Sequence, residues 1–112
     1  KSRSVWQGMI YVAPGAQKTD GYQANRNLVL SDGARADSIP GLEILADDVR
    51  CTHGATVGKL EQEQLFYLQS RGIPQAEAEK IVVEGFYDPI FQRIPFEGVR
   101  ERFQQYIADK MA

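Results

Sequence analysis

The spacing of apolar residues changes once along this chain, near residue 60, and that change limits the folds available to it. Before it, short β-prone segments are separated by glycine and proline turn signals, and after it apolar residues recur at helical spacing. A chain of 112 residues has room for one domain, or for a domain with an appendage. We therefore predict a β part at residues 1–59 and a helical part at residues 60–112.

The β part is predicted to contain five short strands. They are residues 5–12, 27–30, 36–39, 42–46 and 49–57. The turn signals between them are Pro14-Gly15, Asp20-Gly21, Asp32-Gly33 and Pro40-Gly41. Apolar pairs recur at uneven intervals, which suits either an antiparallel sandwich or a solenoid of stacked coils. Because solenoid repeats are usually longer and more regular, the spacing alone slightly favours the sandwich.

The helical part is predicted to contain four helices. The first ends at Gly72, a glycine suited to the left-handed position after a helix, with Ile73 folding back onto Leu68. Pro74 suits the first position of a second helix, which is expected to be short. Asp88-Pro89 is typical of a helix start and predicts a brief third helix.

The last predicted helix follows Pro95 and is amphipathic. Its apolar face consists of Val99, Phe103, Tyr106 and Ile107. Core packing against the β part is the simpler explanation of such faces, and partner docking is the alternative. Aromatic residues in the helical part favour docking, because they offer more aromatic surface than a small end cap requires. These are Phe66, Tyr67, Phe86, Tyr87, Phe91 and Phe96.

Composition excludes several classes of function. Thirteen basic and fifteen acidic residues are interspersed, which argues against a nucleic-acid surface. A single cysteine forms no internal disulfide, and no long apolar run or signal peptide is present, so we expect a soluble protein of a reducing compartment such as the cytoplasm, with no membrane partner.

The chain begins at Lys1 and reads as strand almost at once, which suggests a fragment truncated on its N-terminal side.

The only cysteine and the only histidine lie two residues apart, as Cys51 and His53. On a strand both side chains point to one face, where a thiolate and an imidazole form a metal half-site. A closed tetrahedral centre needs about four ligands, so a second polypeptide would supply the rest. Alternatively, Cys51 is a buried apolar residue and His53 a structural one. A thiol enzyme with His53 as base fits less well, because parallel side chains are poorly placed for proton transfer.

Four ordered motifs resemble the SufB/SufD family of iron–sulfur cluster assembly proteins. They are YQANRNLVLS at 22–31, ADSIPGLEI at 36–44, ADDVRCTHGATVG at 46–58 and EQLFYLQSRGI at 63–73. The forms around Cys51 and Tyr67 look like SufD. SufB-type sequences have Glu-His-Glu-Ala-Thr instead, and Thr52 and Gly54 stand here where that pattern has carboxylates.

The resemblance implies a fold and a set of partners. The fold is the C-terminal coils of a right-handed parallel β-helix followed by a small helical domain, which replaces the sandwich as the expected architecture. The implied function is that of a non-enzymatic scaffold, in the cytoplasm or in a plastid stroma, that pairs with a SufB-like protein through the β-helix. A SufC-like ATPase would dock on the helical end, and candidate docking residues are Phe66, Tyr67, Arg71, Phe86 and Tyr87.

The resemblance also assigns roles at the predicted half-site. His53 matches a histidine of SufD at the SufB interface that handles iron or cluster, and Cys51 matches a nearby cysteine position. We expect no stably bound cofactor, and a transient iron or iron–sulfur cluster in the full complex. A purely structural subunit without metal ligands is the alternative. Exposed strand edges also predict self-association of the isolated fragment.

Overall fold

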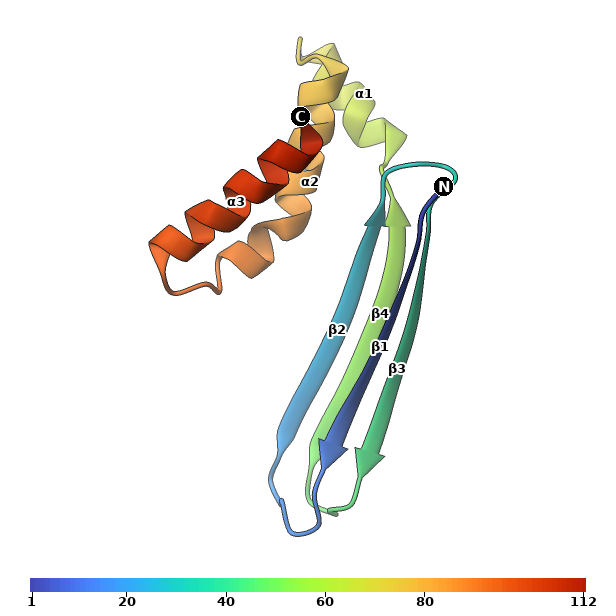
Figure 1. The fold of residues 1–112 in the computed structure, drawn as a ribbon, viewed down its shortest axis with the longest axis vertical. Coiled ribbons are helices and arrows are strands. Elements are labelled where there is room, and N and C mark those ends of the chain that lie inside the picture. Colours follow the sequence, from blue (N-terminus) through green and yellow to red (C-terminus); the bar gives the residue numbers. More distant parts are fainter. The chain divides into compact units, whose positions relative to one another are not determined.

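The computed structural model describes residues 1–112, which form two compact units, residues 1–59 and residues 60–112. The first unit holds four strands: β1 Arg3–Val12, β2 Asp20–Val29, β3 Arg35–Ile44 and β4 Arg50–Lys59 (Figure 1). The second holds three helices: α1 Gln62–Ser70, α2 Gln75–Phe91 and α3 Glu97–Met111. None of these helices combines the length and apolar character needed to cross a membrane.

The strands of the first unit pair in parallel with the strand two further along the chain. β1 pairs with β3, with Arg3 beside Arg35, and β2 pairs with β4, with Asp20 beside Arg50. The register is continuous along both pairs, so the chain alternates between two sheets. The sandwich that the spacing favoured is therefore wrong in its strand direction, because the observed pairs are parallel.

Two of the predicted turns lie inside strands. Asp20-Gly21 begins β2, and Pro40-Gly41 lies within β3, so the predicted strands at 36–39 and 42–46 are one element. Gly41 lies close to the side chain of Met9, where a Cβ would approach the Met9 sulfur to 3.2 Å. Pro40 is tolerated because β3 has only one pairing partner and therefore a free edge. Loops do occur at Pro14-Gly15 and Asp32-Gly33, as predicted.

The two sheets of the first unit face each other across a partly polar interior. Val12 is buried at its apolar end. Farther along, the Asn27 side-chain amide donates to Ser38 Oγ at 3.3 Å and to Asn25 Oδ1 at 2.7 Å, and Ser38 Oγ also donates to Asn25 Oδ1. These bonds link β2 to β3 and satisfy polar groups that would otherwise be costly to enclose.

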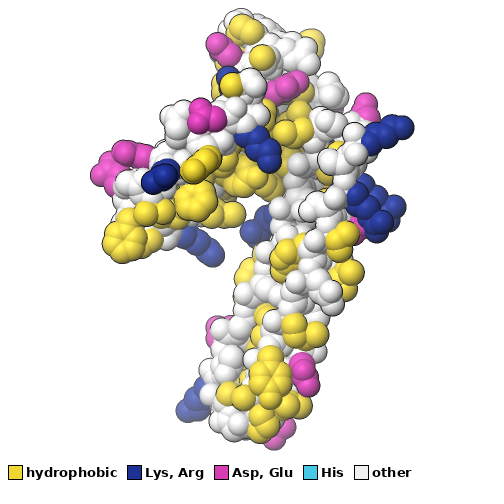
Figure 2. Space-filling model, viewed as in Figure 1, with side chains coloured by type: hydrophobic (Ala, Val, Ile, Leu, Met, Phe, Trp, Pro, Cys, Tyr) yellow, Lys and Arg dark blue, Asp and Glu magenta, His cyan; other side chains and the backbone are white.

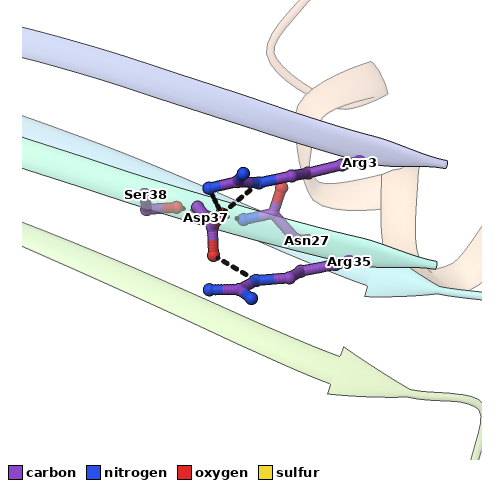
Figure 3. A network of polar contacts seen from close by, with 5 residues as sticks. All are labelled: Arg3, Asn27, Arg35, Asp37 and Ser38. Carbon is purple, nitrogen blue, oxygen red and sulfur yellow. Dashed lines mark hydrogen bonds and ion pairs between the residues drawn. The ribbon is translucent and has the colours of Figure 1, made fainter. Parts of the chain in front are cut away.

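An ion-pair cluster joins the first strand pair. Asp37 accepts a hydrogen bond at 2.8 Å from Arg3 on β1 and one at 2.9 Å from Arg35 on its own strand (Figure 3). The Arg35 guanidinium, followed by that of Arg3, holds the pKa of the Asp37 carboxyl below its ordinary value.

The first helix of the second unit ends as predicted. Gly72 adopts φ +89°, its N–H donates to Gln69 O at 3.0 Å, and the N–H of Ile73 donates to Leu68 O at 3.2 Å. These two bonds define a Schellman ending, in which carbonyls at the helix terminus regain partners. Pro74 is the N-cap of α2 rather than its first residue.

The second helix is longer than predicted and absorbs the expected third one. α2 has 17 residues and contains Asp88 and Pro89 in its last turns. A proline clashes with the carbonyl four residues earlier, and that residue is Gly85, whose backbone is the most adaptable. Leu65, Ala78, Val83 and Phe91 form the buried core, whereas α3 has no buried residue.

The arginine pair around Asp37 predicts a specific pH response. Because its folded pKa is lowered, ionised Asp37 stabilises the folded unit above the ordinary aspartate pKa of about 3.9, and this contribution is lost as pH falls through the lowered pKa. We expect Arg35→Ala to raise the pKa of Asp37 more than Arg3→Ala does. Carbon NMR titration of the carboxyl measures both, and a larger effect of Arg3→Ala would contradict the assignment.

Candidate functional site

Cys51 and His53 both lie on β4, and the register fixes their neighbours. Cys51 lies beside Gly21 of β2, and His53 lies beside Gln23. Residues two apart on a strand share a face, and paired residues of parallel strands point to the same side of their sheet. The strand period therefore places the Cys51 thiol and the His53 imidazole on the same face of β4.

The surroundings of the Cys51 thiol show that this face of β4 is the inner one. A Cβ added to Gly21 would lie 3.3 Å from Cys51 Sγ and 3.6 Å from the Ile10 side chain. Ile10 belongs to β1, in the opposite sheet, so Cys51 points into the space between the sheets. The thiol is half-buried there, in room provided by the missing side chain of Gly21.

His53 lies on the same inner face but is exposed. The reason is topological: β4 pairs only with β2, so no further strand of this chain lies beyond it. The imidazole can therefore be reached by another molecule, whereas the thiol is partly covered by its own unit.

The donor set fits a soft or borderline metal ion. A thiolate and an imidazole are the side chains that bind iron, zinc and related ions through sulfur and nitrogen. They provide two of the roughly four ligands of a closed tetrahedral site. No cluster of three or more His, Cys, Asp or Glu side chains suited to a metal ion occurs in the structure.

The same geometry is unfavourable for a thiol enzyme. The Cα atoms of Cys51 and His53 are separated by two strand steps, about 6.6 Å, and their side chains run roughly parallel. A nucleophile and its base need to approach to hydrogen-bonding distance, near 3 Å. The arrangement is better suited to holding a ligand than to transferring a proton between the two groups.

The predicted docking residues divide into two groups. On α1, Phe66 is 74% exposed and Tyr67 is 55% exposed, and the Arg71 guanidinium lies 5.1 Å from the centre of the Tyr67 ring. On α2, Phe86 and Tyr87 are half-buried and meet edge to face at 5.1 Å. Tyr87 also stacks at 6.0 Å on Phe91, which is buried. The α1 group is thus free for contact, while the α2 group contributes to the core.

Three surface hollows of the helical unit were not found by sequence reasoning. One of about 400 Å³ lies beside Tyr67 and is lined by residues of α1 and by Val82. A larger one of about 750 Å³ lies between α2 and α3 and carries Glu84, Asp88 and Glu101. The third, about 530 Å³, is lined by Val99, Phe103 and Tyr106 of α3. Figure 2 shows hydrophobic side chains exposed on the helical unit. The spacing of Glu84 and Asp88, four residues apart, was the only sequence signal for the acidic one.

Comparison with known proteins identifies the family. Residues 1–86 match the family model described as SUF system FeS cluster assembly, SufBD core domain. The chain therefore belongs to the SufBD family of iron–sulfur cluster assembly proteins, which confirms the resemblance read from its motifs.

Relatives named SufD are among the most similar proteins. The chain is 42% identical over 111 residues to the iron-sulfur cluster assembly protein SufD of Escherichia coli, covering 99% of this chain and 26% of that protein. It is 45% identical to a SufBD family protein of Mycobacterium tuberculosis, covering 98% and 28%. SufD of Bacillus subtilis is 42% identical, with coverage of 96% and 25%. The chain spans about a quarter of the length of these relatives.

The space above Gly21 generates a prediction about the thiol. In Gly21→Ala the new Cβ would press on Cys51 Sγ, so we expect destabilisation of about 1 kcal/mol and faster alkylation of a displaced, more exposed thiol. Gly58→Ala is the matched control on the neighbouring strand, because its Cβ would come no closer than 4.0 Å to Asn27 O.

Mass spectrometry of the Cys51 peptide over a time course of alkylation measures the rate, and thermal unfolding measures the stability. Equal alkylation rates in the two variants would show that Gly21 does not determine the position of the thiol.

Proposed function

We propose that this chain is part of a SufD-type scaffold subunit for iron–sulfur cluster assembly that carries no catalytic chemistry of its own. The observation that carries the proposal is an exposed imidazole beside a half-buried thiol on β4, a strand with one free edge. Membership of the SufBD family supplies the context, since the matched model describes iron–sulfur cluster assembly. By the same kinship we assign the protein to the cytoplasm or to a plastid stroma.

The strand unit is proposed to be two coils of a right-handed parallel β-helix. Parallel pairing of alternate strands, with continuous register in both sheets, supports stacked coils. Right-handed crossovers between parallel strands are strongly preferred, which supports the handedness. In a longer protein of this kind, preceding coils would stack on the free edges of β1 and β2, and the free edge of β4 would stay open.

The free edge of β4 is proposed as the contact with a SufB-like partner. It offers a ten-residue row of backbone donors and acceptors without a strand partner in this chain. A partner strand placed there would bring its own side chains beside His53. Iron or a nascent cluster would then be held as cargo between two polypeptides, with His53 and Cys51 providing this chain's share of the ligands.

The helical unit is proposed to dock a SufC-like ATPase through α1. Phe66 and Tyr67 are exposed aromatic side chains, and Arg71 lies over the Tyr67 ring, a combination enriched at interface hot spots. The hollow beside Tyr67 provides a concave surface next to these anchors. Phe86 and Tyr87 would support that surface from α2 rather than contact the partner.

A purely structural subunit is the second candidate. It is favoured by the half-buried position of the Cys51 thiol over Gly21, which is what an apolar cysteine would show. In that case β4 organises the partners, or pairs with a second copy of the chain, and neither donor touches metal.

Anaerobic reconstitution separates the two candidates. With full-length protein, SufB-like and SufC-like partners, ferrous iron and sulfide, we expect His53→Ala to reduce cluster yield about tenfold or more while partner copurification is unchanged. Gln7→Ala, an exposed change on the other sheet, is the control for general damage. Normal cluster yield with His53→Ala would remove the ligand role and leave the structural subunit.

Docking of the ATPase is tested by binding measurements on the full-length protein. Phe66→Ala and Tyr67→Ala are each expected to weaken binding about thirtyfold, since truncating an interface hot spot costs about 2 kcal/mol. Phe103→Ala on α3 is the matched control, another exposed aromatic of the same unit. Binding weakened by Phe103→Ala alone would transfer the interface from α1 to α3.

A further inference from the structure

Gln23 is the residue of β2 that lies directly beside His53. The two are Cα partners in the parallel register, and strands in a sheet are about 4.8 Å apart. Gln23 points inward, because its side-chain amide donates at 3.1 Å to the backbone carbonyl of Gly41 on the opposite sheet. By the strand period His53 lies on the same side of the sheet, so the two side chains start from adjacent positions of neighbouring strands.

The Gln23 amide is fixed on more than one side. One end is held by the hydrogen bond to Gly41 O, and the other lies against Gly8, where a Cβ would come within 2.9 Å of Gln23 Oε1. The indole of Trp6 fills the rest of the space above Gly8 and would overlap any side chain there. Gln23 is therefore an ordered, half-buried group on the side of His53 that faces the interior.

We propose that Gln23 is a positioning residue for His53, and this rests on the proposed ligand role of that histidine. The anchored Gln23 side chain restricts rotation of the imidazole on the side that faces the interior. The ring is then already oriented on its solvent-exposed side for an ion brought by a partner. An exposed histidine without such support would populate several rotamers and would lose that freedom only on binding. Groups that orient a metal ligand typically change metal affinity 10–100-fold when removed.

Asn25 provides a matched control on the same strand. It too points inward, and its Oδ1 accepts hydrogen bonds from Asn27 and from Ser38 of the opposite sheet. Its partner on β4 is Ala55, however, and not His53. Replacing Asn25 therefore weakens the polar interior to a similar degree without removing the support of the imidazole.

The test uses full-length protein in complex with its SufB-like partner. Co²⁺, a spectroscopic substitute for ferrous iron, is titrated into complexes carrying Gln23→Ala, Gln23→Met, Asn25→Ala or His53→Ala. In parallel, NMR relaxation of the carbon-labelled imidazole, assigned by the signal missing from His53→Ala, reports ring order without metal. Gln23→Met keeps the side-chain length but lacks the amide, and so it carries the test if Gln23→Ala fails to fold.

We expect both Gln23 variants to weaken Co²⁺ binding about tenfold or more and to increase ring mobility, while Asn25→Ala changes neither. Unchanged ring order in the Gln23 variants, or an equal effect of Asn25→Ala, would overturn the positioning role. The proposed function fails separately, if His53→Ala binds Co²⁺ as tightly as the unmodified complex. Ring order in the metal-free protein would still decide the role of Gln23 in that case.

Discussion

The parallel register between β2 and β4 is the constraint on which the candidate site depends. Side chains alternate along a strand, so a slip of one residue would turn Cys51 and His53 from the interior to the outer face. Shape complementarity opposes such a slip: Gly21 on β2 leaves room for the Cys51 thiol of β4, and Gly8 on β1 leaves room for the Gln23 amide of β2. After a slip, side chains would face one another at these positions and clash.

The polar interior adds a second kind of register control. Asn25, Asn27 and Ser38 satisfy one another, and the Asn27 amide also donates to Thr56 O at 3.2 Å on β4. Each such bond adds only about 1 kcal/mol of stability, but a misaligned pairing would leave several of these groups unsatisfied at a cost of about 1–3 kcal/mol each. The network therefore discriminates among registers more than it stabilises the unit, and so it also fixes which face of β4 carries Cys51 and His53.

Sequence patterns predicted those features that depend on local chemistry. The change of period near residue 60 and the ending at Gly72 could be read directly, because a left-handed glycine and an apolar repeat act within a few residues. Strand direction could not, since the same turn signals fit a loop that returns along one sheet and a loop that crosses to the other sheet, as the loops after β1 and β2 do. The turn predicted at Asp20-Gly21 was wrong for a related reason. Gly21 is required because it gives space to a thiol thirty positions away, and only the strand register shows that proximity. Asp88-Pro89 was misread because the adaptable Gly85 lies one helical turn earlier.

In the candidate site, too, local features could be predicted from the sequence and tertiary ones could not. The strand period alone placed Cys51 and His53 on one face. Gln23 lies far from both in sequence, and the motif at 22–31 that contains it assigned it no role, so its position beside His53 followed only from the strand pairing. The exposure of the predicted docking aromatics was likewise a tertiary property. Phe66 and Phe86 are the same residue type on helices, but Phe66 is exposed whereas Phe86 is half-buried and meets Tyr87 edge to face.

Unequal access of the two donors has a chemical consequence for a proposed scaffold. In the proposed role the half-buried thiol of Cys51 is partly covered by its own unit, whereas the imidazole of His53 is exposed to an incoming ion. Under the proposed role, affinity from this chain would come mainly from one nitrogen ligand, which is too little to retain iron without a partner. Weak retention is what cluster transfer requires, because a complete four-ligand site within one chain would hold its cargo rather than release it. Separation of the ligands between two polypeptides makes binding depend on assembly, and makes release possible when the partners move apart.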